Sequence, residues 1–249
     1  MMPRSIKLLI FDLDDTLIDT SGLFFDIKVR FFLRLQLRGF KAADIVRTYD
    51  EIDTRNISLY GYVSERSIVS MRETMESLYW KSGRHFKRAD LEALIRIGSP
   101  CLSQAPPLLP GAKRLLAWCH GNYRLALLTR GSLSLQSVKV ASHHLARYFE
   151  VVRVVASKDQ QVFEDLLRLF KCKPANAVSI GDSPRFDILP AIDLGMNAIY
   201  AKYPRPDRQW KHDKLINGGK AISGPLTHRG REVPTAMCLK DVRSLLEKF

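Results

Sequence analysis

From residue 112 onward, short apolar segments alternate with amphipathic ones, and this alternation constrains the fold more than any other feature. Four of these segments have the length of buried strands: 124–129, 149–156, 177–180 and 197–201. The stretches between them carry apolar residues at helical spacing. Strands that alternate with helices form parallel βαβ units, so we predict an α/β fold with a doubly wound parallel sheet. The apolar segment 5–13 adds one more strand to it.

Residues 20–105 have a different pattern, in which apolar residues recur every three or four positions. Ile27, Phe31 and Leu35 are one such series. The region therefore reads as all-helical, and it ends in the proline-containing loop at 105–107. We predict two domains: an α/β domain formed by residues 1–19 and 106–249, and a helical domain formed by residues 20–105.

Residues 203–236 mix prolines and glycines without any visible period, which predicts a long loop before a last helix at 240–248. The chain carries 39 basic against 26 acidic residues, a formal net charge of +13. This excess is spread along the chain and fits a basic surface or attraction of phosphorylated substrates. No nucleic-acid recognition motif accompanies it, so nucleic acid is not an expected partner.

No apolar window approaches the ~20 residues that a membrane span needs, and the short apolar run near the N-terminus does not resemble a signal peptide. The four cysteines have no CxxC spacing and predict free buried thiols rather than a metal or disulfide framework. We therefore expect a cytoplasmic protein without a membrane partner. The oligomeric state cannot be inferred from the sequence.

Ligands of doubly wound sheets bind beyond the C-terminal ends of the strands. The first predicted strand ends in Asp12, Asp14 and Asp15. Carboxylates this close repel one another in a buried site, and a hard divalent cation such as Mg²⁺ would neutralise them. The alternative is an acidic cap, in which Asp14 or Asp15 starts the next helix.

The strand at 177–180 ends in a similar group, with Gly181 followed by Asp182 and Asp187. A turn into the next helix would bring the two carboxylates together. In the alternative interpretation, Gly181 is a turn residue and Asp187 caps the following helix.

Two more strand ends carry polar groups. Thr129, Arg130 and Gly131 follow the strand at 124–129, where a hydroxyl and backbone amides suit phosphate oxygens or a simple helix cap. Lys158 follows the strand at 149–156, where a lysine is usually solvated.

Taken in order, these groups resemble the four motifs of the haloacid dehalogenase superfamily of phosphohydrolases. DxDxT is present at residues 12–16, the second-motif hydroxyl is Thr129, the third-motif lysine is Lys158, and GDxxxxD is present at residues 181–187. The resemblance covers residues 5–202. It implies that the helical region 20–105 is the cap domain of this family, whereas residues 203–236 are not explained by it.

The resemblance implies that Asp12 is a nucleophile that forms an aspartyl-phosphate, and that Asp14 protonates the leaving oxygen and then deprotonates water. It implies a Mg²⁺ ion held by the carboxylates of Asp12 and Asp182 and by the backbone carbonyl of Asp14, with Asp187 supporting the metal. Lys158 would offset the charge of the phosphoryl group.

Thr129 and the Gly131 region would then bond phosphoryl oxygens. Arg130 stands where the family usually has a small polar residue, and it is either a substrate-phosphate contact or an outward salt-bridge partner. A phosphate ester needs an acid at position 14, whereas a halide leaves unprotonated. We therefore predict a Mg²⁺-dependent phosphomonoester hydrolase acting on a small phosphorylated metabolite. The alternatives are a phosphomutase of the same fold, or a non-catalytic protein that binds nucleic acid or another partner.

Overall fold

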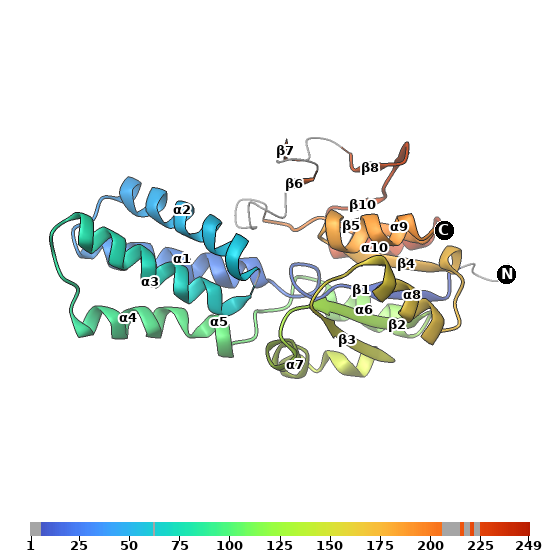
Figure 1. Cartoon of the computed structure of the whole chain (residues 1–249). Coiled ribbons are helices and arrows are strands. Elements are labelled where there is room, and N and C mark those ends of the chain that lie inside the picture. The colour runs from blue at the N-terminus through green and yellow to red at the C-terminus, as the bar shows by residue number, and fades with distance from the viewer. Residues whose placement is uncertain (1–5, 62, 206–214, 217–219, 222–224) are drawn as a thin grey trace. The chain divides into compact units, whose positions relative to one another are not determined.

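The computed structural model describes residues 6–61, 63–205, 215–216, 220–221 and 225–249 (Figure 1). The chain forms two compact units. Unit 1 comprises Met1–Gly22 with Pro106–Phe249, and unit 2 comprises Leu23–Ala105. Among the described helices, none has the length and apolar character needed to cross a membrane.

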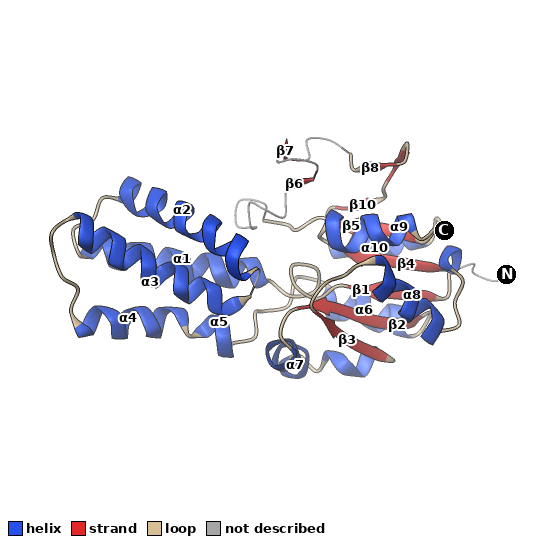
Figure 2. Ribbon diagram, viewed as in Figure 1, coloured by secondary structure: helices blue, strands red, loops and turns tan. Residues whose placement is uncertain are grey.

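Unit 1 is an α/β unit built on a parallel sheet (Figure 2). Its main elements are β1 (Leu8–Phe11), α6 (Ala112–His120), β2 (Arg124–Arg130), α7 (Leu133–Ser142), β3 (Val151–Val155), α8 (Gln160–Leu169), β4 (Ala177–Gly181), α9 (Leu189–Asp193), β5 (Asn197–Ala201), β10 (Thr235–Ala236) and α10 (Leu239–Leu246). The strand order is β10-β5-β4-β1-β2-β3, and every pairing is parallel. The predicted α/β fold with a parallel sheet is confirmed.

The central strand β1 is buried on both faces of the sheet. Its successive side chains point to opposite faces, and each face is covered by helices. Leu9 and Phe11 of β1 belong to an apolar cluster that includes residues of α6 and α10. Leu8 and Ile10 of β1 belong to a second cluster, which includes residues of α8 and α9. The continuous apolar character of the strand thus follows from its central place in the sheet.

The prediction of a long loop at 203–236 is wrong in part. Residues 206–214, 217–219 and 222–224 lie outside the described residues. Around them are two short antiparallel pairs, β6 (Leu215–Ile216) with β7 (Lys220–Ala221) and β8 (Thr227–His228) with β9 (Arg231–Glu232). The following strand β10 pairs with β5 and becomes an edge of the main sheet. Two-residue strands leave no periodic pattern in a sequence, which is why this one was missed.

Unit 2 is helical. It contains most of α1 (Thr20–Leu37), followed by α2 (Ala42–Tyr60), α3 (Ser64–Lys81), α4 (Arg88–Gly98) and the single turn α5 (Pro100–Ser103). The series Ile27, Phe31 and Leu35 lies on one face of α1 and packs in a shared apolar core with residues of α2, α3 and α4.

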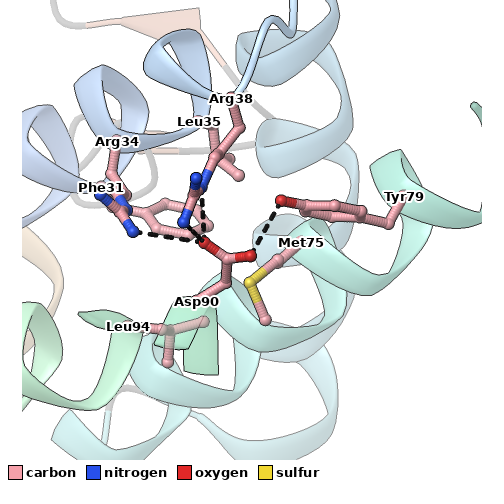
Figure 3. A pocket seen from close by; sticks show the side chains of 8 residues that line it. All are labelled: Phe31, Arg34, Leu35, Arg38, Met75, Tyr79, Asp90 and Leu94. Atoms are coloured by element: carbon pink, nitrogen blue, oxygen red, sulfur yellow. Dashed lines mark hydrogen bonds and ion pairs between the residues drawn. The ribbon is translucent and has the colours of Figure 1, made fainter. Parts of the chain in front are cut away.

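A buried acidic residue, Asp90, joins three helices of this unit (Figure 3). Arg34 and Arg38 of α1 and the Tyr79 hydroxyl of α3 all donate to its carboxylate, at 3.3, 2.6 and 3.2 Å. The adjoining cavity has a volume of about 10 Å³, room for a single water molecule at most. Arg34 and Arg38 therefore bind a buried carboxylate within unit 2.

Candidate active site

The strand order of unit 1 brings the predicted motifs together at one edge of the sheet. β1 lies between β4 and β2, and β3 is the next strand beyond β2. Phe11 pairs in register with both Ile180 of β4 and Leu127 of β2. Because the strands are parallel and in register, the residues that follow them emerge at the same level.

Asp12, Lys158 and Asp187 form one buried ion-paired group. The Lys158 ammonium donates to Asp12 Oδ1 and, at 2.6 Å, to Asp187 Oδ1. All three residues are almost fully buried. The interpretation of Lys158 as a solvated side chain is therefore wrong. The Ser183 amide donates to the other oxygen of Asp187 at 3.0 Å, so both of its oxygens are held.

Burial sets the ionisation of this group. Removal from water raises the pKa of Asp12 to about 7, and the nearby carboxylates of Asp187 and Asp14 add to the rise, against the opposing charge of Lys158. Burial alone lowers the pKa of Lys158, but Asp12 and Asp187 outweigh it and raise that pKa. Lys158 is thus a permanent cation, and one positive charge does not fully compensate the carboxylates around it.

The residues present fit a divalent cation. Carboxylate oxygens of Asp12, Asp182 and Asp187 lie within 4.8 Å of one another, and all three residues are buried. An oxygen-only donor set is what Mg²⁺ prefers, and the raised pKa of Asp12 marks negative charge that a cation would relieve. Asp182 is fixed by Thr16, whose hydroxyl accepts from the Asp182 amide at 3.0 Å.

The Asp14 carboxylate has a separate environment. Gln136 donates to Asp14 Oδ2 at 2.7 Å, and Lys139 donates to Asp14 Oδ1 at 2.7 Å, joined there by the Thr20 hydroxyl. Burial acts to raise the pKa of Asp14, but Lys139 and the hydrogen bonds outweigh it, and the pKa lies below the ordinary value. The structure does not bring this carboxylate into the metal-type cluster. Its predicted ligand atom, the backbone carbonyl, stays a prediction.

The three residues of the second motif, Thr129, Arg130 and Gly131, make different contacts. The Thr129 side chain is buried and accepts from Gln136 at 2.6 Å. The guanidinium of Arg130 stacks on the ring of Phe186, 3.8 Å from its centroid, which links this motif to the fourth. Gly131 has a φ of 145°, and its amide donates to the Val155 carbonyl at 3.0 Å. That amide is therefore engaged with β3.

The alternative interpretations of the acidic residues apply only in part. Asp15 does cap α1, because its Oδ1 accepts from the Ser21 amide at 2.7 Å. Asp14 does not cap this helix with its carboxylate; its partners are the side chains described above. Asp187 does accept from the Ser183 amide, four residues earlier at the start of the helical segment Pro184–Ile188, but it also faces Lys158.

Sequence reasoning missed Gln136 and Lys139. They lie one helical turn apart on α7, which the periodicity identified only as a helix. The signal that could have found them is their spacing from the apolar Val140. Gln136 lies four residues before Val140 and three before Lys139, so a helix that buries Val140 also turns both polar side chains inward.

Comparison with known proteins gives the same assignment as the motifs. The model of the haloacid dehalogenase-like hydrolase family matches residues 6–195. A curated protein of Pyrococcus furiosus, named glyceraldehyde 3-phosphate phosphatase, is 27% identical over 217 residues, which cover 84% of this chain and 87% of the relative.

Solved structures share the fold. A haloacid dehalogenase-like hydrolase from Xanthomonas campestris superposes with a TM-score of 0.70 at 24% identity, over 99% of this chain and 98% of that one. A HAD-hydrolase from Bacillus subtilis, solved bound to magnesium, superposes with a TM-score of 0.63 at 16% identity, over 97% and 98% of the two chains. With its family match over most of its length and its motifs gathered at one sheet edge, this chain belongs to the haloacid dehalogenase-like hydrolases.

Proposed function

We propose that this protein is a phosphatase that hydrolyses small phosphorylated metabolites through an aspartyl-phosphate on Asp12. The observation that carries the proposal is the buried group of Asp12, Lys158 and Asp187, with Asp14 two residues beyond the nucleophile. Asp12 would attack phosphorus, breaking the bond to the ester oxygen, and water would then release phosphate and regenerate the carboxylate.

Lys158 would hold the Asp12 side chain in place and offset the negative charge that builds up between two anionic reactants. Its burial and its two ion pairs keep it charged and leave little freedom to its ammonium group. The Thr129 hydroxyl accepts from Gln136, which leaves its own proton to donate to a phosphoryl oxygen.

Asp14 distinguishes an ester from a halide as the substrate. An alkoxide leaving group must be protonated, and water must be deprotonated in the second step, whereas halide needs no acid. The lowered pKa of Asp14 favours the ionised form, which is the base that takes a proton from water in the second step. The proton taken up in that step is the one that Asp14 gives to the leaving oxygen in the following turnover.

The residues support Mg²⁺ as the cofactor, held by the carboxylates of Asp12 and Asp182 and the backbone carbonyl of Asp14, with Asp187 in support. When bound, the ion would polarise the phosphoryl group and lower its negative charge. The magnesium-bound relative from Bacillus subtilis is consistent with this assignment.

The relative from Pyrococcus furiosus is named for a small phosphorylated aldehyde, which supports a small phosphorylated substrate for this chain. We also propose that unit 2 is the cap domain of the family and takes part in the choice of substrate.

The test is phosphate release from a panel of phosphorylated metabolites, with Mg²⁺ and with EDTA, for the wild type and Asp12→Asn. We expect release that EDTA abolishes and Mg²⁺ restores, and a loss of at least about 1,000-fold in the variant. The partly exposed Asp44 of α2 gives the matched control, because Asp44→Asn makes the same chemical change at a residue that belongs to none of the four motifs.

A second readout follows the intermediate itself. Acid quenching with a ³²P-labelled substrate should leave label on the wild type and on Asp44→Asn but not on Asp12→Asn. Wild-type turnover in Asp12→Asn would refute the proposal. Transfer that needs a bisphosphate activator and frees little phosphate would point to a phosphomutase instead.

A further inference from the structure

Two long polar side chains of helix α7 are buried, whereas two of its apolar residues are exposed. Gln136 is 2% exposed and Lys139 is 9% exposed, whereas Leu133 is 70% and Val138 is 43% exposed. A surface helix normally buries its apolar stripe. Glutamine and lysine are rarely this buried unless they bind a partner, so the inward face of α7 needs an explanation beyond packing.

Gln136 connects two motifs that are far apart in the sequence. Its amide nitrogen lies 2.7 Å from Asp14 Oδ2, 2.6 Å from Thr129 Oγ1 and 2.8 Å from the Arg130 carbonyl. Within the part of the chain that the structure describes, its Oε1 is buried without a hydrogen-bond partner. A buried acceptor without a hydrogen bond loses its hydration without compensation and destabilises the fold, so packing alone does not account for a glutamine here.

Lys139 completes the hold on Asp14. Its ammonium lies 2.7 Å from Asp14 Oδ1, so α7 binds one carboxylate oxygen through Lys139 and the other through Gln136. Two donors on one rigid helix fix the plane of the carboxylate as well as its position. A single ion pair would leave the carboxylate free to rotate about its last bond.

We propose that Gln136 and Lys139 are positioning residues, which orient Asp14 for proton transfer and tie it to the phosphate-binding hydroxyl of Thr129. This inference rests on the proposed phosphatase function. The two residues act through Asp14 and Thr129 and need not touch the phosphoryl group. Departures from good packing are expected where a residue is retained for its place in a site.

The competing explanation is that the two side chains only attach α7 to unit 1. The two explanations differ in how activity depends on the leaving group. Protonation matters greatly for a basic alkoxide and little for p-nitrophenolate, which leaves as an anion. Misplacing Asp14 should therefore slow formation of the aspartyl-phosphate far more from alkyl than from aryl esters, whereas damage to the fold should slow both alike. The second role of Asp14, as the base for water, comes after the alcohol has left and is common to both esters, so kcat/KM, which covers the steps up to that release, isolates the first role.

The experiment measures kcat/KM for Gln136→Leu and Lys139→Met on p-nitrophenyl phosphate and on the alkyl phosphate that the wild type hydrolyses fastest. We expect kcat/KM on the alkyl ester to fall about 100-fold and kcat/KM on the aryl ester less than about 5-fold. Lys139→Arg should recover part of the alkyl activity, because it restores a cation. Gln161→Leu on α8 and Lys113→Met on α6 change exposed residues and should match the wild type.

Equal losses on both esters, accompanied by a lower unfolding midpoint, would overturn the inference and leave a structural role. Full activity of both variants on the alkyl ester would also overturn it. If Gln136→Leu fails to fold, Lys139→Met alone decides by the same ratio of losses. A wild type that releases phosphate from neither ester would instead refute the phosphatase function, and the inference with it.

Discussion

At the scale of single residues, the site depends on close approach of backbone to side chain at the end of β4. A Cβ atom on Gly181 would lie 2.3 Å from the Cγ atom of Asp187. Glycine is therefore required at this position by space, not by backbone conformation. The close approach places the Asp187 carboxylate where it can face Lys158.

Gly181→Ala should displace the Asp187 side chain and weaken its ion pair with Lys158. We expect a loss of about 1–3 kcal/mol in the free energy of unfolding and a fall in kcat of at least 10-fold. Gly121→Ala is the control, because a Cβ there would meet its nearest atoms only at 3.8 Å. Thermal unfolding and phosphate release measure the two effects. A Gly181→Ala variant as stable and active as Gly121→Ala would contradict this account.

At the scale of elements, α1, α3 and α4 meet at Asp90. Burial alone would raise the pKa of this carboxyl, but hydrogen bonds from the Lys87 amide and from Arg38 outweigh it, and the pKa lies below its ordinary value. A carboxyl whose pKa is lower in the folded than in the unfolded protein stabilises the fold above its unfolded pKa. That stabilisation is lost as the pH falls through the folded value.

Asp90→Asn should therefore destabilise the protein in a pH-dependent way. We expect a loss of about 2 kcal/mol at pH 7, because hydrogen bonds from charged groups become neutral ones. The difference from the wild type should shrink towards zero as the pH falls below about 4. Urea unfolding at pH 7 and pH 3 measures it. The control Asp44→Asn should lower the free energy of unfolding by less than about 1 kcal/mol at either pH. If Asp90→Asn lowers the free energy of unfolding equally at both pH values, the stabilising role of the ionised Asp90 is refuted.

The elements also show what a sequence can and cannot predict. Strands β2, β4 and β5 were predicted within one residue, because a buried parallel strand is a continuous apolar run. The helical pattern of residues 20–105 does not show where each helix begins: α4 begins at Arg88, and Asp90 accepts from the Lys87 amide at 3.1 Å. The contact between Gln136 and Asp14 could not be predicted from the sequence, because the two residues lie far apart along the chain. The Gln136 amide contacts Asp14, which lies 122 positions away, and no local pattern encodes such a distance.

At the scale of the whole molecule, each unit buries a cysteine that can report on its opening. Cys101 lies in the core of unit 2 and Cys119 in that of unit 1. Burial raises the pKa of each thiol to about 12, with Glu65 adding to the rise at Cys101. Because thiolates are the reactive form, both should be protected in the folded protein.

Labelling with a thiol reagent at pH 8 should modify the exposed Cys238 first and leave Cys101 and Cys119 unmodified until unfolding. We expect Cys101 to become reactive at a lower urea concentration than Cys119, because unit 2 is smaller and smaller cores are less stable. Mass spectrometry of protein labelled at increasing urea concentrations measures the order. Simultaneous labelling would mean that both units unfold in one transition, and rapid labelling without urea would contradict the burial.

The central position of β1 has a consequence for synthesis on the ribosome. The strand is made at residues 8–11, but its neighbours β2 and β4 begin only at residues 124 and 177. At ~5–20 residues per second, the 113 residues from Phe11 to Arg124 take roughly 6–23 s to translate. Throughout that interval the nascent chain carries an apolar segment without its sheet partners. The helices of unit 2 are made in the same interval, so among the inner strands of the sheet, the first one translated waits longest for both of its neighbours.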